Sequence, residues 1–547
     1  MEFYKKVILE LLSAVLFSVS IPNEYLIYGS AFTGLFALVP HFTALKNSTS
    51  IKESCILCFI QCITTHLLSS WWLGLFEGFA LFTLGASAIG TGLIHSVFGI
   101  FFFLPKYIHS LKAAPENIRI KVSNPCFTII WFTAVYTVFE FVKCTGFLAY
   151  PWGTLPLVTY NAKFLSQIVD LAGTRLITFI YSLFAAGAAV YFDEWNKNRK
   201  TVDFQPALGI ALIFAVSVFY GIFQYTKVRI PQKYINTVFI QQNADPWKMK
   251  DDRQSILVSE ELTGKAVYDM HRKGFNPDLI VWSEGILRFP LPEGMIHYNF
   301  FPEESPLLNF IKEYEVPFII GGPYSLNFDN LEFYNSAIVF NKDASLKGYY
   351  AKTQLVPFAE YIPFTKYKIV QTLLLKLAGF ARGWVPGNAY KTFDVECQNA
   401  DGSRDSALIS IPICFEDAFG ECCRGLKKAG SELFINITDD SWSLTKSAEY
   451  QHYVISWFRS MEFRTTLVRS TNSGVTAVID PSGKVLADLP LFEKNYLNFE
   501  VPLYSNTKTL YCIFGEWLSF ILVIFIAFYT ISAILFTEKS LKNTRAV

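Results

Sequence analysis

Eight long apolar stretches dominate this chain and limit what it can fold into. They cover residues 7–20, 25–45, 51–76, 79–104, 127–148, 165–192, 206–223 and 513–536. A helix needs about 20 apolar residues to cross the roughly 30 Å hydrocarbon core of a bilayer, and most of these stretches reach that length. Hydrophobic residues make up 52% of the 547 residues, which is more than an average soluble protein contains. We therefore predict a membrane domain of seven spans at residues 1–225, a polar domain at 226–508, and a closing span with a tail at 509–547.

Basic residues gather in every second connection between the apolar stretches. The intervening connections carry little positive charge, with Lys143 and Lys163 as exceptions. The positive-inside rule then places the amino terminus in the cytoplasm and residues 226–508 on the outer side. Because Lys5 and Lys6 precede the first stretch, a cleavable signal peptide is the alternative, but residues 18–22 match a cleavage site only loosely. The basic residues in question are Lys5, Lys6, Lys46, Lys52, Lys106, Lys112, Arg119, Lys121, Lys197, Arg199, Lys200, Lys539, Lys542 and Arg545.

Charge and cysteine content narrow the possible partners. The net charge is +1 and no basic block is present, so we expect no nucleic-acid partner. Cys55 and Cys58 have the spacing of a metal-binding pair, but inside an apolar helix small buried hydrophobic residues are the favoured interpretation. A disulfide among the cysteines of the polar domain stays open, since it depends on the compartment; these cysteines are Cys397, Cys422 and Cys423.

The polar domain alternates strand-like and helical patterns. Such alternation favours a layered α/β fold in which helices cover a sheet. The expected helices are 255–272, 305–314, 417–429 and 448–462. The expected strands are 236–241, 279–282, 318–321, 336–340, 407–413, 433–437, 466–470 and 476–480.

Three separated segments of this domain carry a carboxylate, an amine and a thiol. Glu284 ends the run VWSE, Lys352 lies in YYAKT, and Cys414 lies in IPICFED. Glu284 and Cys414 follow expected strands, and strand ends are where layered α/β folds place their chemistry. A neighbouring ammonium can lower the pKa of a thiol while a carboxylate takes its proton. The thiolate can then attack an ester or amide carbonyl and hold the acyl group as a thioester.

The flanks of these residues resemble a known family. The runs LIVWSE at 279–284, YAKTQLVPFAEYIP at 350–363, ICFE at 413–416 and RSTNSGVTA at 469–477 are similar to the carbon-nitrogen hydrolase, or nitrilase, superfamily. More narrowly, they resemble the apolipoprotein N-acyltransferase family. The connection TGFLAYPWG at 145–153 and the seven-plus-one span arrangement are similar to that family as well.

The resemblance implies an αββα sandwich facing the periplasm, on a multi-pass protein of the bacterial inner membrane. It implies Cys414 as the nucleophile, Glu284 as the general base and acid, and Lys352 as the cation that stabilises the oxyanion. The backbone N–H of Phe415 is the expected second oxyanion donor. Glu360 and Glu416 match two further family positions, and a supporting role at the site is the favoured interpretation; the alternative for each is a structural ion pair or a carboxylate at a helix start.

The implied reaction has two stages and needs no metal or organic cofactor. A membrane phospholipid, chiefly phosphatidylethanolamine in the family, acylates Cys414, and the acyl chain then passes to the amino-terminal diacylglyceryl-cysteine of a lipoprotein. Two alternatives remain open: a membrane-tethered amidase that hydrolyses a small polar amide, and a non-catalytic lipid-binding scaffold. The apolar run 369–380, inside the segment 364–387, suits an arm that dips into the membrane, or a packed core helix.

The sequence also departs from the family pattern. Phe415 stands where the family often has Tyr, residues 438–444 differ from the commoner run, and Thr465-Thr466 replaces a frequent Arg-Pro pair. These differences concern details of substrate contacts and leave Glu284, Lys352 and Cys414 in place.

Overall fold

The computed structural model describes residues 1–76, 80–111, 124–197, 205–244, 251–361, 367–368, 372 and 383–545. Within it the chain divides into two compact units. The helical unit comprises Met1–Lys227, Thr445–Val454 and Ile513–Val547, and the α/β unit comprises Val228–Leu444 and Ile455–Cys512. These boundaries lie within a few residues of the expected ones after 225 and 508, but Thr445–Val454, expected in the polar domain, belongs to the helical unit.

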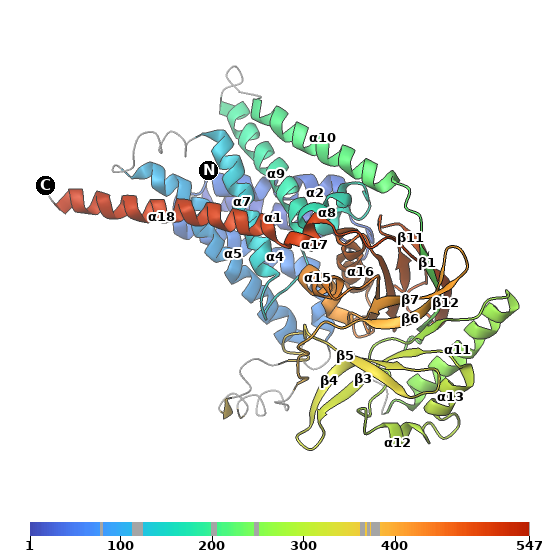
Figure 1. Cartoon of the computed structure of the whole chain (residues 1–547). Coiled ribbons are helices and arrows are strands. Elements are labelled where there is room, and N and C mark those ends of the chain that lie inside the picture. The colour runs from blue at the N-terminus through green and yellow to red at the C-terminus, as the bar shows by residue number, and fades with distance from the viewer. Residues whose placement is uncertain are drawn as a thin grey trace. The chain divides into compact units, whose positions relative to one another are not determined.

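The helical unit is built mainly from long apolar helices (Figure 1). Among the described residues, six helices are long and apolar enough to cross a bilayer, and they account for six of the eight expected spans. The six are α4 (Ile51–Ser69), α5 (Ala80–Ser110), α7 (Pro125–Lys143), α9 (Thr174–Lys197), α10 (Gln205–Thr226) and α18 (Trp517–Arg545); the shorter elements are η1 (Trp71–Leu75), η2 (Leu155–Thr159), η3 (Leu165–Ile168), α8 (Val169–Ala172) and α17 (Leu510–Phe514).

The other two expected spans differ from single apolar helices. The stretch 25–45 forms α2 (Ala31–Ala37) and α3 (Val39–Lys46), which meet at Leu38. Pro40 lies in the first turn of α3, where its missing N–H costs little, but it cannot continue the preceding helix. The first stretch forms α1 (Phe3–Ser20), an 18-residue helix that carries Lys5, Lys6 and Glu10.

Two buried polar pairs hold α1 in the helical unit. Lys6 Nζ donates to Glu53 Oε1 at 2.7 Å, and Glu10 Oε2 lies 2.6 Å from His41 Nδ1. Each pair joins α1 to another helix, so these ionisable residues replace the apolar contacts of an ordinary span.

The α/β unit contains one hydrogen-bonded path of strands. Its order is β11-β10-β9-β8-β7-β6-β1-β2-β3-β4-β5, and β12 pairs with β1 off this path. All eight expected strands are confirmed. The strands β5, β6, β11 and β12 were not anticipated. The bounds are β1 Lys233–Gln241, β2 Leu279–Val281, β3 Phe318–Asn327, β4 Glu332–Phe340, β5 Leu346–Ala351, β6 Phe393–Asn399, β7 Arg404–Ser410, β8 Leu433–Thr438, β9 Thr466–Thr471, β10 Ala477–Ile479, β11 Val485–Asp488 and β12 Asn495–Leu503.

Helices cover the faces of these strands and fix where the strands end. Figure 1 shows α11 (Arg253–Arg272) and α13 (Leu307–Tyr314) beside β1 to β4. Ile256 and Leu262 of α11 and Ile311 of α13 share one apolar core with those strands. The remaining helices are α12 (Met295–Tyr298), α15 (Gly420–Lys428) and α16 (Lys446–Glu462). Burial of both strand faces explains the continuous apolar run at β2. Every residue of β8 is buried as well, including the polar Asn436 and Thr438.

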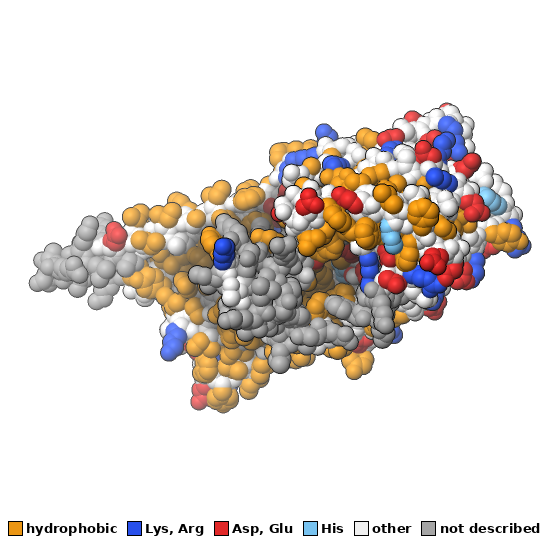
Figure 2. Space-filling model, turned by 90° about the horizontal axis from the view of Figure 1, so that it is seen from below, with side chains coloured by type: hydrophobic (Ala, Val, Ile, Leu, Met, Phe, Trp, Pro, Cys, Tyr) orange, Lys and Arg blue, Asp and Glu red, His pale blue; other side chains and the backbone are white. Residues whose placement is uncertain are grey.

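The two units differ in surface character. On the face drawn in Figure 2, most charged side chains lie on the α/β unit, and apolar side chains dominate the helical unit. Leu208 and Phe219 of α10 are each 73% exposed, and Ile524 of α18 is 68% exposed. Helices that expose such side chains on many sides are suited to lipid contact.

Candidate active site

Two glutamates and one lysine form a buried cluster at the ends of β2 and β5. Lys352 directly follows β5 and is 1% exposed. Its Nζ donates to Glu284 Oε1 at 3.2 Å and to Glu360 Oε1 at 2.8 Å. Glu284 follows β2 by three residues. The structure therefore brings together three of the predicted site residues through direct contacts.

Asn335 completes this cluster, and the sequence analysis missed it. It lies on β4, and its Nδ2 donates to Glu284 Oε1 at 2.8 Å and to Glu360 Oε1 at 2.9 Å. The two carboxylates thus share an amide donor as well as an ammonium, which lets like charges approach each other. The available signal in the sequence was an asparagine next to Ser336, just before the apolar run Ala337–Phe340 of β4.

Backbone amides fix the second oxygen of each glutamate. Asp439 N–H donates to Glu284 Oε2 at 3.0 Å, and Val356 N–H donates to Glu360 Oε2 at 2.8 Å. Both oxygen atoms of each carboxylate therefore accept hydrogen bonds. The contact from Asp439 uses only the backbone, so it does not depend on which side chains stand at residues 438–444.

Cys414 lies at a strained turn, and its thiol is close enough to Glu284 and Lys352 for their charges to act on it. It opens η4 (Cys414–Ala418) with a φ of 45°, in the left-handed region that residues other than glycine seldom adopt. Asn436 of β8 holds the turn, because its Nδ2 donates to the carbonyls of Pro412 at 3.2 Å and Cys414 at 3.3 Å. Such strain persists only where the surroundings enforce it, and it is concentrated at functional sites.

Glu416 joins the Cys414 turn to the Lys352 loop. Its Oε2 accepts from Ile413 N–H at 2.8 Å, while its Oε1 accepts from Thr353 N–H at 2.6 Å and from Tyr350 Oη at 2.8 Å. Glu416 is fully buried, and this burial raises the pKa of its carboxyl group. Because it grips the neighbours of Cys414 and Lys352 rather than those residues themselves, Glu416 has the geometry of a positioning residue.

Phe415 contributes packing through its ring. The side chain is 3% exposed and meets Phe419 edge-on, with ring centroids 4.8 Å apart. The ring therefore packs against another aromatic side chain, and the expected oxyanion donor at this position is the backbone N–H.

The electrostatics of the site keep the thiol protonated at rest. Burial and the Glu284 charge raise the pKa of Cys414 well above its usual value, and Lys352 opposes them only in part. The ammonium of Lys352 lowers the thiol pKa as expected, but burial and the Glu284 charge outweigh its effect. Burial also disfavours the ammonium of Lys352, but Glu284 and Glu360 raise its pKa well above the ordinary value. The cation is permanent, and the thiolate must be generated by a base during the reaction.

A second ionic layer supports the turn. Arg469 of β9 is fully buried, pairs with Asp417, and donates to Asp440 Oδ2 at 3.1 Å. This arginine begins one of the runs quoted above for the family resemblance. Asp417 lies in η4 together with Cys414, and Asp440 lies in the loop after β8. Arg469 therefore ties both segments to β9.

Comparison with known proteins extends over both units. Residues 266–509 match the carbon-nitrogen hydrolase family, and residues 13–187 match the apolipoprotein N-acyltransferase N-terminal domain. Apolipoprotein N-acyltransferase 2 of Treponema denticola is 41% identical over 96% of this chain and 97% of its own length. The protein of the same name from Treponema pallidum is 36% identical over 92% of this chain and 91% of its own. This chain belongs to the apolipoprotein N-acyltransferase family.

A third relative is consistent with this assignment. The apolipoprotein N-acyltransferase of Borreliella burgdorferi is 31% identical over 93% of this chain and 92% of its own. The family resemblance seen in the sequence is confirmed, and the α/β unit has the carbon-nitrogen hydrolase fold expected for it. The chain is accordingly an acyltransferase of that fold class and, with its six apolar helices, a multi-pass membrane protein.

In this family member, only the end of the expected arm can be described. Residues 364–366, 369–371 and 373–382 of the segment 364–387 lie outside the described residues. The following stretch runs along the site: Trp384 N–H donates to the carbonyl of Glu360 at 2.8 Å, and Gly387 N–H donates to that of Lys352 at 2.8 Å. The end of the segment is thus hydrogen-bonded to two residues of the cluster.

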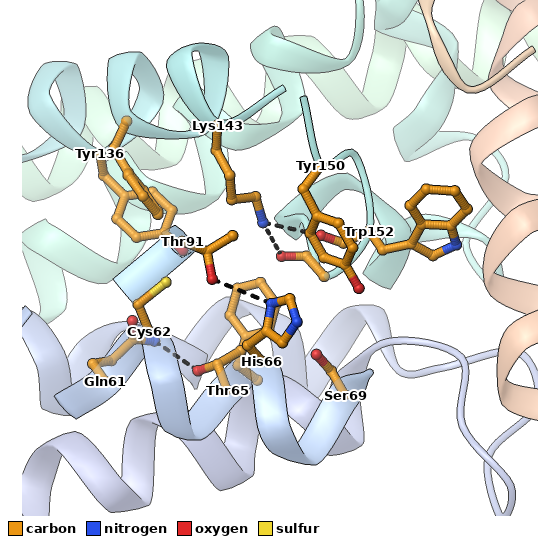
Figure 3. A pocket seen from close by; sticks show the side chains of 13 residues that line it. Gln61, Cys62, Thr65, His66, Ser69, Thr91, Tyr136, Lys143, Tyr150 and Trp152 are labelled. Carbon is orange, nitrogen blue, oxygen red and sulfur yellow. Dashed lines mark hydrogen bonds between the residues drawn. The ribbon is translucent and has the colours of Figure 1, made fainter. Parts of the chain in front are cut away.

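A cavity in the helical unit is separate from this site. Figure 3 shows Lys143 donating to the carbonyl of Trp152 at 3.0 Å, and His66 bonded to Thr91 Oγ1 at 3.2 Å. None of the predicted site residues lines this cavity. All ten cysteines are free thiols in the described structure, so the possible disulfide among Cys397, Cys422 and Cys423 does not form there.

Proposed function

We propose that this family member transfers an acyl chain from a membrane phospholipid to the amino-terminal diacylglyceryl-cysteine of lipoproteins, through a thioester on Cys414. The observation that carries the proposal is the ammonium of Lys352, buried between Glu284 and Glu360 beside a thiol at a strained turn. The names of the relatives supply the acceptor class. This arrangement pairs a nucleophile with a base and a permanent cation, which is what acyl transfer requires.

In the first stage, Cys414 attacks the carbonyl carbon of a phospholipid ester. Glu284 takes the thiol proton as the carbon–sulfur bond forms, and Lys352 with the Phe415 N–H stabilises the negative oxygen. The tetrahedral intermediate collapses when the carbon–oxygen bond breaks. Glu284 returns the proton to the departing oxygen, so a lysophospholipid leaves and a thioester remains.

In the second stage, the α-amino group of the lipoprotein attacks the thioester. Glu284 accepts a proton from the amine, and the carbon–nitrogen bond forms through a second tetrahedral intermediate. The carbon–sulfur bond then breaks, and the proton returns to the sulfur of Cys414. The products are an N-acylated lipoprotein and the free enzyme, which balances the two stages without a metal or organic cofactor.

The proposal also includes the lipid donor, the membrane and the side of the membrane that the α/β unit faces. Phosphatidylethanolamine is the proposed donor, the membrane is the bacterial inner membrane, and the α/β unit faces the periplasm. The charge pattern of the connections supports that orientation, and mature lipoproteins present their amino terminus on that side.

Intact-mass spectrometry of the purified full-length protein tests this function. Incubation with phospholipid vesicles should add one acyl mass to the wild type and none to Cys414→Ala, because the proposed site has a single nucleophile. Cys397→Ala is the matched control and should acylate normally. Addition of a diacylated lipopeptide should remove the acyl mass from the protein. The same mass should then appear on the lipopeptide, as an amide at its amino terminus. Discharge to water alone would identify a hydrolase, and acylated Cys414→Ala would overturn the proposal.

A further inference from the structure

Four polar side chains meet inside the helical unit. Glu10 comes from α1, His41 from α3, Cys58 from α4 and His95 from α5. All four are fully buried. Polar groups that converge from four separate helices in an apolar interior need partners, since each unsatisfied group costs free energy.

Three of these side chains are placed as metal ligands. A nitrogen of His41, a nitrogen of His95 and Sγ of Cys58 all lie within 4.8 Å of one another. Zinc bonds of about 2.0–2.3 Å at tetrahedral angles would put ligand atoms about 3.3–3.6 Å apart. A closure of roughly 1 Å separates the two arrangements, which small side-chain rotations can supply.

Glu10 orients His41 toward this cluster. Its Oε2 lies 2.6 Å from His41 Nδ1, so with an ionised carboxylate Nδ1 carries the proton and Nε2 presents a lone pair. That Nε2 has no hydrogen-bond partner in the described structure. A carboxylate that accepts from the far nitrogen of a ligating histidine is a common way to set its tautomer and orientation.

His95 is held by packing rather than by hydrogen bonds. Its ring stacks on Phe139 with centroids 4.0 Å apart and an interplanar angle of 20°. Neither of its nitrogens makes a hydrogen bond of normal geometry with the described residues, although the backbone of Cys58 is close by. The thiol of Cys58 is likewise free. The three ligand side chains therefore lie close together and have unused lone pairs.

We propose that His41, His95 and Cys58 bind one Zn²⁺ ion, with Glu10 as the hydrogen-bond acceptor that orients His41. Binding releases the Cys58 proton and forms a zinc–thiolate bond. The charges of Zn²⁺, one thiolate and one carboxylate then sum to zero, which suits a site buried among apolar helices. Imidazole and thiolate together are ligands that zinc prefers, whereas magnesium and calcium prefer oxygen.

The proposed ion would clamp α3, α4 and α5 and, through Glu10, α1. It makes no use of the Cys55-x-x-Cys58 spacing, because Cys55 is outside the group of converging ligands. This role concerns the membrane-embedded part of the chain and does not depend on the acyl-transfer proposal.

Metal analysis of the full-length protein in detergent tests the proposal. After chelation and reloading with Zn²⁺, the wild type should retain about one zinc per chain, because the three side chains form one site. Reloading with Co²⁺ should produce a thiolate-to-cobalt charge-transfer band. Both signals should be lost in Cys58→Ser and His95→Gln. They should persist in Cys55→Ser, which changes a cysteine on the same helix outside the cluster.

Measurements on the wild-type protein alone also test the zinc site, so the test does not depend on whether the variants fold. Zn²⁺ should raise the thermal unfolding temperature of the chelated wild type, and Mg²⁺ should not. A wild type that retains no zinc and gives no cobalt band would overturn the site. Retention of both signals in Cys58→Ser would do the same.

Discussion

Lys352 is a buried cation whose charge is balanced by neighbouring carboxylates. Its ammonium faces two carboxylates, Glu284 and Glu360, and the amide of Asn335 donates to the same two oxygen atoms. Removing one partner of a buried charged group costs much more than removing an exposed pair, because the remaining charge stays desolvated. Single substitutions in this cluster should therefore have large effects on chemistry.

We predict that Asn335→Ala slows acyl-enzyme formation by about 10- to 100-fold, the range expected for a hydrogen bond to a charged group. Loss of the amide leaves Glu284 and Glu360 to repel each other across Lys352. The measurement is the single-turnover rate of mass addition at Cys414. Asn341→Ala changes an asparagine just past the end of the same strand, β4, and should react at the wild-type rate. Equal rates for both variants would exclude this role for Asn335.

The carboxyl group of Asp439 makes the stability of the folded chain depend on pH. Burial, with a smaller contribution from the Glu284 charge, raises its pKa from 3.8 to about 6. The folded state therefore holds this proton more tightly than the unfolded chain. The resulting stabilisation is complete below pH 3.8 and is lost as the pH rises through about 6.

In the wild type, Ser441 N–H and Asn472 Nδ2 donate to Asp439 Oδ1. Asp439→Asn keeps an oxygen acceptor for these two donors but removes the titrating carboxyl group. We predict that the variant gains stability relative to the wild type as the pH rises through this window. Thermal unfolding of both proteins between about pH 4 and pH 7 measures the difference. A difference that does not change with pH would show that Asp439 does not titrate in this range.

At the scale of elements, β3 determines where the Glu284 loop can lie. Gly321 of β3 packs directly against that loop, with its N–H donating to the carbonyl of Ser283 at 3.1 Å. A Cβ atom at Gly321 would lie 2.5 Å from Glu284 Cα and 2.6 Å from the Ser283 oxygen. Because these are backbone atoms, the strand and the loop must separate if a side chain is added.

We therefore predict that Gly321→Ala shifts Glu284 and reduces acyl-enzyme formation by about 100-fold, as a misplacement of roughly 1 Å in a catalytic group does. Gly264→Ala is the matched control. It adds the same methyl group to α11, where the nearest atom is the hydroxyl of Tyr314 at 3.3 Å. The control should acylate normally and gain about 1 kcal/mol of helix stability. Normal acylation of Gly321→Ala would show that the loop adapts without loss.

At the scale of the whole molecule, the open question is which side of the membrane receives the α/β unit. We predict that reporters fused after Lys163 and Asn243 read as outside the cytoplasm. Reporters after Lys121 and Lys200, two positions outside the described residues, should read as cytoplasmic, because basic connections stay inside. A fusion after Arg545 is the control and should also read as cytoplasmic. A cytoplasmic signal at Asn243 would reverse the proposed orientation.

Patterns within short stretches of the chain determined much of this protein. Apolar length predicted six of the described membrane-length helices, and apolar β-rich runs located eight strands, because both depend on local periodicity. The single helix expected at 25–45 was wrong, since the break near Pro40 interrupts a stretch whose composition still looks continuous. Glu284, Lys352 and Cys414 were found because their chemistry and flanking residues are distinctive.

Only the tertiary structure decided how distant side chains meet. Asn335 is 51 positions from Glu284 and Asp439 is 155 positions away, and their contacts depend on strand order and register rather than on any local pattern. The raised pKa of Cys414 reflects burial, which short patterns do not reveal. His41 and His95 each read as an isolated residue in an apolar stretch, and Cys58 reads as a small buried hydrophobic residue that shares a helix with Cys55. They become a candidate zinc site only when helix packing brings their ligand atoms together, because convergence in space is a property of packing and not of spacing along the chain.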